Sequence, residues 1–169
     1  MDATELRAMQ APIKERYKIT PGAALITLKA KGKLDDTNIV CKVETGRALA
    51  VAGLHPATGG SGLELCSGDL LLEALVACAG VTLKAVSTAL GISLKSGTVS
   101  AEGDLDFRGT LGVDKDTPVG FREIRLRFDL DTEAPQDKLE QLLKLTERYC
   151  VVYQTIRSGP PVDIKLRRM

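Results

Sequence analysis

Residues 67 to 91, SGDLLLEALVACAGVTLKAVSTALG, form a long and almost continuously apolar stretch, and they decide the fold. Leucine and alanine dominate this stretch, and neither proline nor a run of β-branched residues interrupts it, which predicts an α-helix. Ser67 or Asp69 can cap its beginning, and Gly91 supplies the left-handed residue that ends it. A helix that is apolar on nearly all sides is expected to be buried on nearly all sides, as a core helix.

The composition of the whole chain argues against several classes of function. Lys and Arg number 23 against 22 Asp and Glu over 169 residues, so charge gives no reason to expect nucleic acid or an anionic membrane as partner. Asp69, Glu73 and Lys84 leave no uncharged run of the roughly 18 residues that a membrane span requires. The N-terminus has no apolar signal core, which predicts a cytoplasmic protein.

Alternating apolar and polar residues predict strands on both sides of the core helix. Residues 1 to 20 predict an N-terminal helical arm, and residues 21 to 169 predict a single domain. Within that domain the expected strands lie near residues 24–30, 39–43, 48–52, 99–107, 124–130 and 162–166. A second helix is expected to begin at Pro135 and to end or break near Cys150. The order βββ-α-ββ-α-β predicts an α+β fold in which antiparallel sheets pack on two core helices.

Four cysteines are spread along the chain without a CxxC pair: Cys41, Cys66, Cys78 and Cys150. This spacing suits neither a zinc site nor a small secreted disulfide scaffold, so no metal or other cofactor is expected. Cys41 falls on the apolar side of a strand and is expected in the core. The remaining thiols are either inert core residues or redox-active ones.

Cys78 lies in the middle of the predicted core helix, where no residue one turn away is charged. Burial raises the pKa of a thiol, so Cys78 is inert unless another element brings a cation to it. Arg47 and Lys33, on two early strands, are the candidates. Cys150 lies beside Arg148 at the predicted end of the second helix, a position typical of redox-active thiols.

Five segments, in order, resemble the OsmC/Ohr family of osmotically inducible protein C and organic hydroperoxide resistance proteins. The segment LLLEALVAC, with Thr82 four residues after its cysteine, is similar to the family's first-cysteine motif. The segment RYCVVYQTI is similar to its second-cysteine motif. The segments VSAEGDLDFRGTLG, VGFREIRLRFDLDTEAP and PPVDIKL resemble its middle part and its closing strand, so the resemblance covers about residues 29 to 167.

The resemblance implies a thiol peroxidase that reduces organic hydroperoxides. Cys78 would attack the peroxide as a thiolate, and Cys150 would condense with the resulting sulfenic acid to a disulfide. A small dithiol or a thioredoxin-like protein would then reduce that disulfide. The family forms intertwined homodimers with sites near the subunit interface, in which an arginine of an early strand lowers the pKa of the first thiol. Arg47 is preferred to Lys33 for that role, and Asp69 is a candidate to hold the arginine.

Two positions depart from the pattern of the hydroperoxide reductases. Val151 stands where the family has proline after the second cysteine, and Gly68 stands where the hydroperoxide branch has glutamate. The first helix is closer to the OsmC-like branch. The alternative function is a non-enzymatic binder of hydrophobic small molecules with structural cysteines. Cys66 is an alternative resolving thiol, and His55, the only histidine, is expected to be a solvated loop residue.

Overall fold

The structure is a computed structural model that describes residues 3–34, 41–43, 53–63 and 66–168. It confirms the predicted α+β class, with helices packed on an antiparallel sheet. The strand expected near residues 48–52 lies outside the described residues, and so does Arg47.

The sheet has four antiparallel strands in the order β2-β1-β3-β4. Their bounds are Leu25–Leu34 for β1, Cys41–Val43 for β2, Ser96–Asp106 for β3 and Glu123–Asp131 for β4. The register places Lys33 opposite Thr98 and Ser96 opposite Asp131. Along β3 the buried and half-buried residues alternate as predicted, so Val99 and Ala101 lie in the core.

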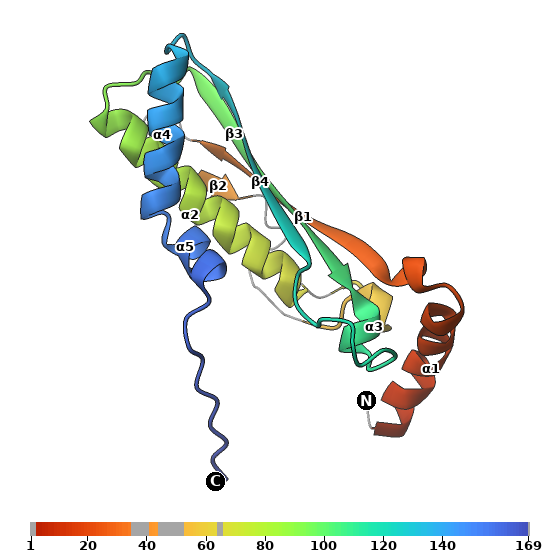
Figure 1. Ribbon diagram of the computed structural model, residues 1–169. Helices are drawn as coiled ribbons and strands as arrows, with labels where there is room; N and C mark the ends of the chain where they lie inside the picture. Colours follow the sequence, from red (N-terminus) through yellow and green to blue (C-terminus); the bar gives the residue numbers. More distant parts are fainter. Residues whose placement is uncertain (1–2, 35–40, 44–52, 64–65, 169) are drawn as a thin grey trace.

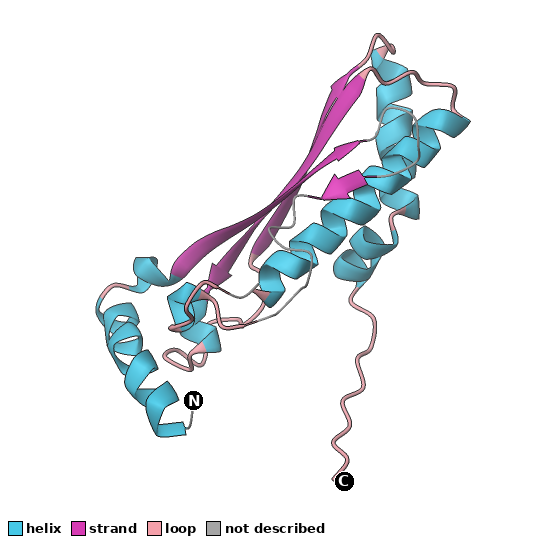
Figure 2. Ribbon diagram, turned by 180° about the vertical axis from the view of Figure 1, so that it is seen from behind, coloured by secondary structure: helices cyan, strands magenta, loops and turns pink. Residues whose placement is uncertain are grey.

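Three helices cover one face of this sheet (Figures 1 and 2). They are α2 (Ser67–Ala89), α4 (Gln136–Tyr149) and α5 (Val151–Ser158). By length and composition α2 could cross a membrane. However, it contacts β1, β3, α4 and α5, and its own Leu72, Leu75 and Val76 are buried. The expectation that it would be buried on nearly all sides was wrong, because Leu71 and Val81 on its other side are exposed.

Both ends of α2 can be compared with the prediction. Cys66 precedes the helix as its N-cap and makes no side-chain capping bond, so the prediction that Ser67 or Asp69 would cap it was wrong. Asp69 instead lies in the first turn, where a carboxylate is favoured by the helix dipole. Gly91 has a φ of 68°, the left-handed conformation that was predicted to end the helix.

Helix α1 (Ala3–Ile19) forms the N-terminal arm and lies at the end of the sheet remote from α4 (Figures 1 and 2). Its last turn is attached to the body through Tyr17, which is fully buried. The Tyr17 hydroxyl donates a hydrogen bond of 2.6 Å to the carbonyl of Ala57, at the short helix η2 (Pro56–Thr58). A second short helix, η1 (Pro21–Ala24), leads from the arm into β1.

The strand expected at residues 162–166 is not formed. Val162, Ile164 and Leu166 are 79%, 89% and 99% exposed, and the segment runs away from the body (Figures 1 and 2). An alternating pattern indicates that a segment can pair as a strand, but its main-chain groups also need a neighbouring strand. No described strand of the same chain lies beside this segment.

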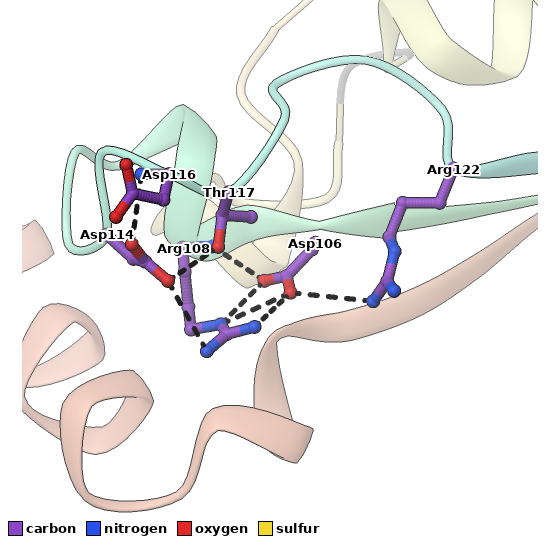
Figure 3. Close-up of polar contacts among 6 residues, drawn as sticks. All are labelled: Asp106, Arg108, Asp114, Asp116, Thr117 and Arg122. Carbon is purple, nitrogen blue, oxygen red and sulfur yellow. Dashed lines mark hydrogen bonds and ion pairs between the residues drawn. The ribbon is translucent and has the colours of Figure 1, made fainter.

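The connection between β3 and β4 differs from the prediction at its beginning. Phe107, expected in a strand, starts the short helix α3 (Phe107–Thr110). The alternation of apolar and polar residues in the expected strand 99–107 places Asp106 on the wet face of the sheet, but the residue is only 1% exposed. Its carboxylate caps α3 by accepting the main-chain N–H of Arg108, and it pairs with the guanidinium of the same residue at 2.6 Å (Figure 3). A local hydrogen bond of this kind ends a strand that alternation alone would continue.

Candidate thiol site

The break between α4 and α5 builds one half of the candidate site. Cys150 is the C-cap of α4 and the N-cap of α5, and its extended backbone separates the two helices. The sequence predicted that the helix would end or break here, and the structure confirms it. The first hydrogen bond within α5 runs from the N–H of Gln154 to the carbonyl of Cys150 at 2.9 Å. The three preceding N–H groups therefore have no carbonyl partner inside the helix.

Helix α2 supplies the other half through Cys78, which is half-buried. Helix α5, which begins directly after Cys150, packs on α2, so the fold brings into one region two cysteines that are far apart in sequence. The main chain of Val152 and Val151, the Cys150 thiol and the hydroxyl of Thr82, one turn along α2, all lower the pKa of Cys78.

The two thiols differ in how readily they ionise. Burial opposes ionisation of Cys78, but the N–H of Val152, the Cys150 thiol, the Thr82 hydroxyl and the N–H of Val151 together lower its pKa below 9.0. Burial raises the pKa of Cys150 to about 11, and its bond to Cys78 acts in the same direction. Cys78 is therefore the thiol that ionises first, and Cys150 holds its proton beside it.

The structure gives different information on each residue that was expected to help activate Cys78. Arg47 lies outside the described residues, so its role stays a prediction. Lys33 lies in β1, opposite Thr98. Asp69 is nine residues before Cys78 on the same helix, which corresponds to about 13 Å along the axis. Asp69 interacts instead with His55, and burial raises its carboxyl pKa while His55 opposes that rise.

Two further residues behave differently from the prediction. Cys66 precedes Cys78 by twelve residues of α2, about 18 Å along the axis, whereas a disulfide needs Cα atoms within about 7 Å. It therefore cannot pair with Cys78 of the same chain while α2 is intact. His55 is a half-buried residue and not a solvated one. Its ring stacks on Phe107 at 4.9 Å, its Nδ1 accepts the N–H of Ala57 at 3.0 Å, and burial lowers its pKa.

A mostly apolar cavity of about 300 Å³ lies between β4 and the helices α2, α4 and α5, and neither Cys78 nor Cys150 is among the residues that line it. Leu75, one turn before Cys78, and Tyr153, three residues after Cys150, contribute to its wall. The remaining lining residues are Ile124, Leu126, Phe128, Leu143, Glu147, Ile156 and Arg157. The cavity therefore shares helices α2 and α5 with the region of the two cysteines, but the thiols do not line it.

Sequence reasoning missed the donors that come from the main chain. No side chain identifies Val151 or Val152 as part of a site, and the only available signal was the expected helix break at Cys150. Elsewhere in the described residues, no group of three His, Cys, Asp or Glu side chains gathers as a metal site.

Comparison with known proteins gives a consistent family and fold. A family model described as OsmC-like protein matches residues 59–165. An OsmC-like hydroperoxide resistance protein from Jannaschia sp. CCS1 superposes with a TM-score of 0.63 at 14% identity, covering 86% of this chain and 95% of that one. An OsmC-like protein from Mycoplasma pneumoniae gives a TM-score of 0.55 at 14% identity, covering 80% and 86%. No curated protein gives a significant match.

Proposed function

The chain belongs to the OsmC-like family, and on that premise we propose that it is a thiol peroxidase that reduces organic hydroperoxides. The observation that carries the proposal is the packing of α5 on α2, which brings together Cys78, a thiol with a lowered pKa, and Cys150, a thiol with a raised one. A thiolate nucleophile beside a protonated thiol is what a two-cysteine peroxidase needs.

The proposed reaction has two steps. The Cys78 thiolate attacks the terminal oxygen of the hydroperoxide, so an S–O bond forms, the O–O bond breaks, and the leaving alkoxide takes a proton to become the alcohol. Cys78 is then a sulfenic acid. Cys150 attacks its sulfur; a disulfide forms, and the hydroxyl leaves as water with the proton of the Cys150 thiol. Two electrons have passed from the two thiols to the peroxide.

The family and the cavity between β4, α2, α4 and α5 support the proposed substrate class. The wall of this cavity is mostly apolar, and a cavity of about 300 Å³ can receive the alkyl or aryl part of a small organic hydroperoxide. Hydrogen peroxide has no apolar part to bury there. We therefore propose organic hydroperoxides in preference to hydrogen peroxide.

The cycle also needs a reductant. A small dithiol or a thioredoxin-like protein would exchange with the Cys78–Cys150 disulfide and restore both thiols. A cytoplasmic location would suit this exchange, because that compartment maintains a pool of reducing thiols.

The test is the product of stoichiometric oxidation. The wild type, treated with one equivalent of cumene hydroperoxide, is expected to lose two thiols and to yield a Cys78–Cys150 disulfide by peptide mapping. Cys150→Ser should stop at a sulfenic acid on Cys78, which dimedone traps. Cys78→Ser should leave the hydroperoxide unconsumed, with a rate at least a thousandfold lower. A wild type whose thiols all survive the hydroperoxide contradicts the proposal.

The same cavity supports a second candidate function, the non-enzymatic binding of a hydrophobic small molecule. In that case the two cysteines are structural, and their contact only fills the space between α2 and α5. The oxidation experiment separates the two functions, because a binder would keep its thiols in hydroperoxide yet retain an apolar probe such as a fluorescent fatty acid.

We also propose that the chain forms a homodimer, in which residues 162–166 pair as a strand with a second copy. These residues alternate in polarity and expose their apolar side chains, and β4 is an edge strand of the described sheet. Ile164→Asp should convert the dimer to a monomer in analytical ultracentrifugation, whereas Lys165→Ala should not. A wild type that sediments as a monomer at micromolar concentration would rule the pairing out.

A further inference from the structure

His55, the single histidine of the chain, organises the short helix η2. Its Nδ1 atom accepts the main-chain N–H of Ala57 at 3.0 Å and so caps the beginning of η2. Its carbonyl accepts the N–H groups of Thr58 at 2.8 Å and Gly60 at 3.1 Å, which close the turn. A ring nitrogen that accepts a hydrogen bond carries no proton, so this arrangement requires the neutral imidazole with its proton on Nε2.

Helix η2 in turn holds the N-terminal arm, helix α1. The carbonyl of Ala57 accepts the hydroxyl of the fully buried Tyr17, in the last turn of α1, at 2.6 Å. Helix α1 also contacts α3, which begins at Phe107. The ring of Phe107 stacks on the imidazole of His55 with 4.9 Å between the ring centroids and 17° between the planes. The imidazole therefore contacts both η2 and α3, two elements on which the arm packs.

Charged side chains of three neighbouring helices surround this region. Among the described residues, Asp69 of α2 is the charged group that shifts the pKa of His55, and it favours protonation. Burial opposes protonation more strongly, so the pKa of His55 lies below 6.5. The other charged side chains nearest to these contacts are Arg16 and Lys18 on α1, Glu73 on α2 and Arg108 on α3.

We propose that His55 is a pH-sensitive switch that attaches the N-terminal arm to the body while its imidazole is neutral and releases the arm when the imidazole is protonated. The inference is independent of the proposed peroxidase function. A protonated imidazole carries a proton on both ring nitrogens, so Nδ1 becomes a donor that faces the N–H of Ala57, another donor. The cap of η2 is then lost, and the Ala57 carbonyl is no longer held in place for the Tyr17 hydroxyl.

The release is expected on the acidic side of pH 6.5. A histidine in the unfolded chain protonates near pH 6.5, whereas His55 in the folded protein protonates at a lower pH. The attachment is therefore complete above pH 6.5 and is lost as the pH falls through the lowered value. A helix of 17 residues is only marginally stable in water, so α1 is expected to unfold when it leaves the body.

Nuclear magnetic resonance tests both halves of the proposal in one sample. Because the chain has one histidine, long-range ¹H–¹⁵N spectra between pH 8 and pH 4.5 report the tautomer and the pKa of His55 without ambiguity. Amide hydrogen exchange of α1, corrected for the intrinsic effect of pH, reports its attachment. The neutral ring is expected to carry its proton on Nε2, and the protection of α1 should fall about tenfold with the same midpoint as the imidazole.

Three variants separate the imidazole from other groups that titrate in acid. The side-chain oxygen of asparagine can cap η2 and does not titrate, so His55→Asn should keep the protection of α1 constant from pH 8 to pH 4.5. Asp69→Asn removes the charge that favours protonation, so the pKa of His55 and the midpoint for α1 should fall together. Glu15→Gln is the matched control, because it removes the carboxylate that pairs with Lys18 at 2.7 Å within α1 and should leave the midpoint unchanged.

The proposal is overturned by any of three results. The first is a neutral imidazole with its proton on Nδ1, because such a ring cannot cap η2. The second is an α1 whose protection stays constant while His55 titrates, or whose midpoint fails to follow the pKa of His55 in Asp69→Asn. The third is an acid release of α1 that persists in His55→Asn, which would assign the effect to another group.

Discussion

Two groups in this molecule ionise more readily than their burial would allow, and they are stabilised in different ways. Asp106, at the end of β3, is paired with the guanidinium of Arg108 at 2.6 Å and lies 3.9 Å from that of Arg122 (Figure 3). These partners lower the pKa of its carboxyl against the effect of burial. The pKa of Cys78 is also lowered against the effect of burial, and the groups of the described residues that lower it are main-chain N–H groups, a thiol and a hydroxyl.

The difference explains what each group can do. A guanidinium stays charged at any pH that a protein survives, so Asp106 stays ionised and the ion pair works as a structural tie. Among the described residues the groups that lower the pKa of Cys78 are neutral, and neutral donors stabilise an anion less strongly than a cation does. These groups therefore favour the Cys78 thiolate, which is the nucleophilic form of the residue. The ion pairs of Asp106, at the end of β3, are suited to hold a loop in place. The Cys78 thiol, on α2, is suited to react.

The largest effect on stability is expected from the loss of Asp106, at the end of β3. Asp106→Ala removes the N-cap of α3 and both ion pairs, and it leaves the guanidinium of Arg108 without its nearest carboxylate. We expect the free energy of unfolding to fall by about 2–4 kcal/mol in urea denaturation. Cys78→Ser, which replaces one hydrogen-bonding group by another, should change it by less than about 1 kcal/mol.

A matched control uses the same loop. Asp116 is exposed, and its N–H donates to the Asp114 carboxylate at 3.1 Å, a contact that Asp116→Ala keeps (Figure 3). The free energy of unfolding of the Asp116→Ala variant should therefore match that of the wild type within about 0.5 kcal/mol. If Asp106→Ala were as stable as this control, the ion pairs would not hold the loop. The contrast between Asp106 as a structural group and Cys78 as a reactive group would then fail.

The periodic features of the fold could be predicted from the sequence. The long apolar run of α2, the alternation of β3 and the helix break at Cys150 are local patterns, because each depends on residues a few positions apart. Asp106 was assigned to the wet face by the same alternation and was wrong, because its capping bond to the N–H of Arg108 overrides the strand pattern.

The candidate site was predictable only in part. The resemblance singled out Cys78 and Cys150, but the groups that lower the pKa of Cys78 include the main chain of Val151 and Val152, which carries no sequence signal. The segment 162–166 shows the converse limit. Its alternation indicates the ability to form a strand, yet pairing depends on a neighbour that the described part of the chain does not supply.

The smallest effect is expected in the dependence of stability on pH. Asp106 should act at acidic pH, and the two thiols should act at alkaline pH. The folded-state pKa of Asp106 is lowered, so its contribution is present above pH 4 and is lost as the pH falls through that lowered value. The pKa of Cys78 is also lowered, so its contribution grows as the pH rises towards 9.0. The pKa of Cys150 is raised from 9.0 to about 11. Its contribution is therefore present below pH 9 and is lost between pH 9 and 11, because the unfolded chain ionises first.

Lysine and tyrosine residues also titrate at alkaline pH, so the prediction concerns a difference between variants. The stability of the wild type relative to Cys150→Ser should be constant from pH 6 to 8 and should decline by about 1–2 kcal/mol between pH 9 and 11, measured by urea denaturation under reducing conditions. Asp106→Asn should show the same alkaline decline as the wild type but a smaller loss of stability below pH 4. A wild type and Cys150→Ser that follow parallel curves through pH 11 would mean that Cys150 does not hold its proton beside Cys78. The order of ionisation proposed for the two thiols would then be wrong.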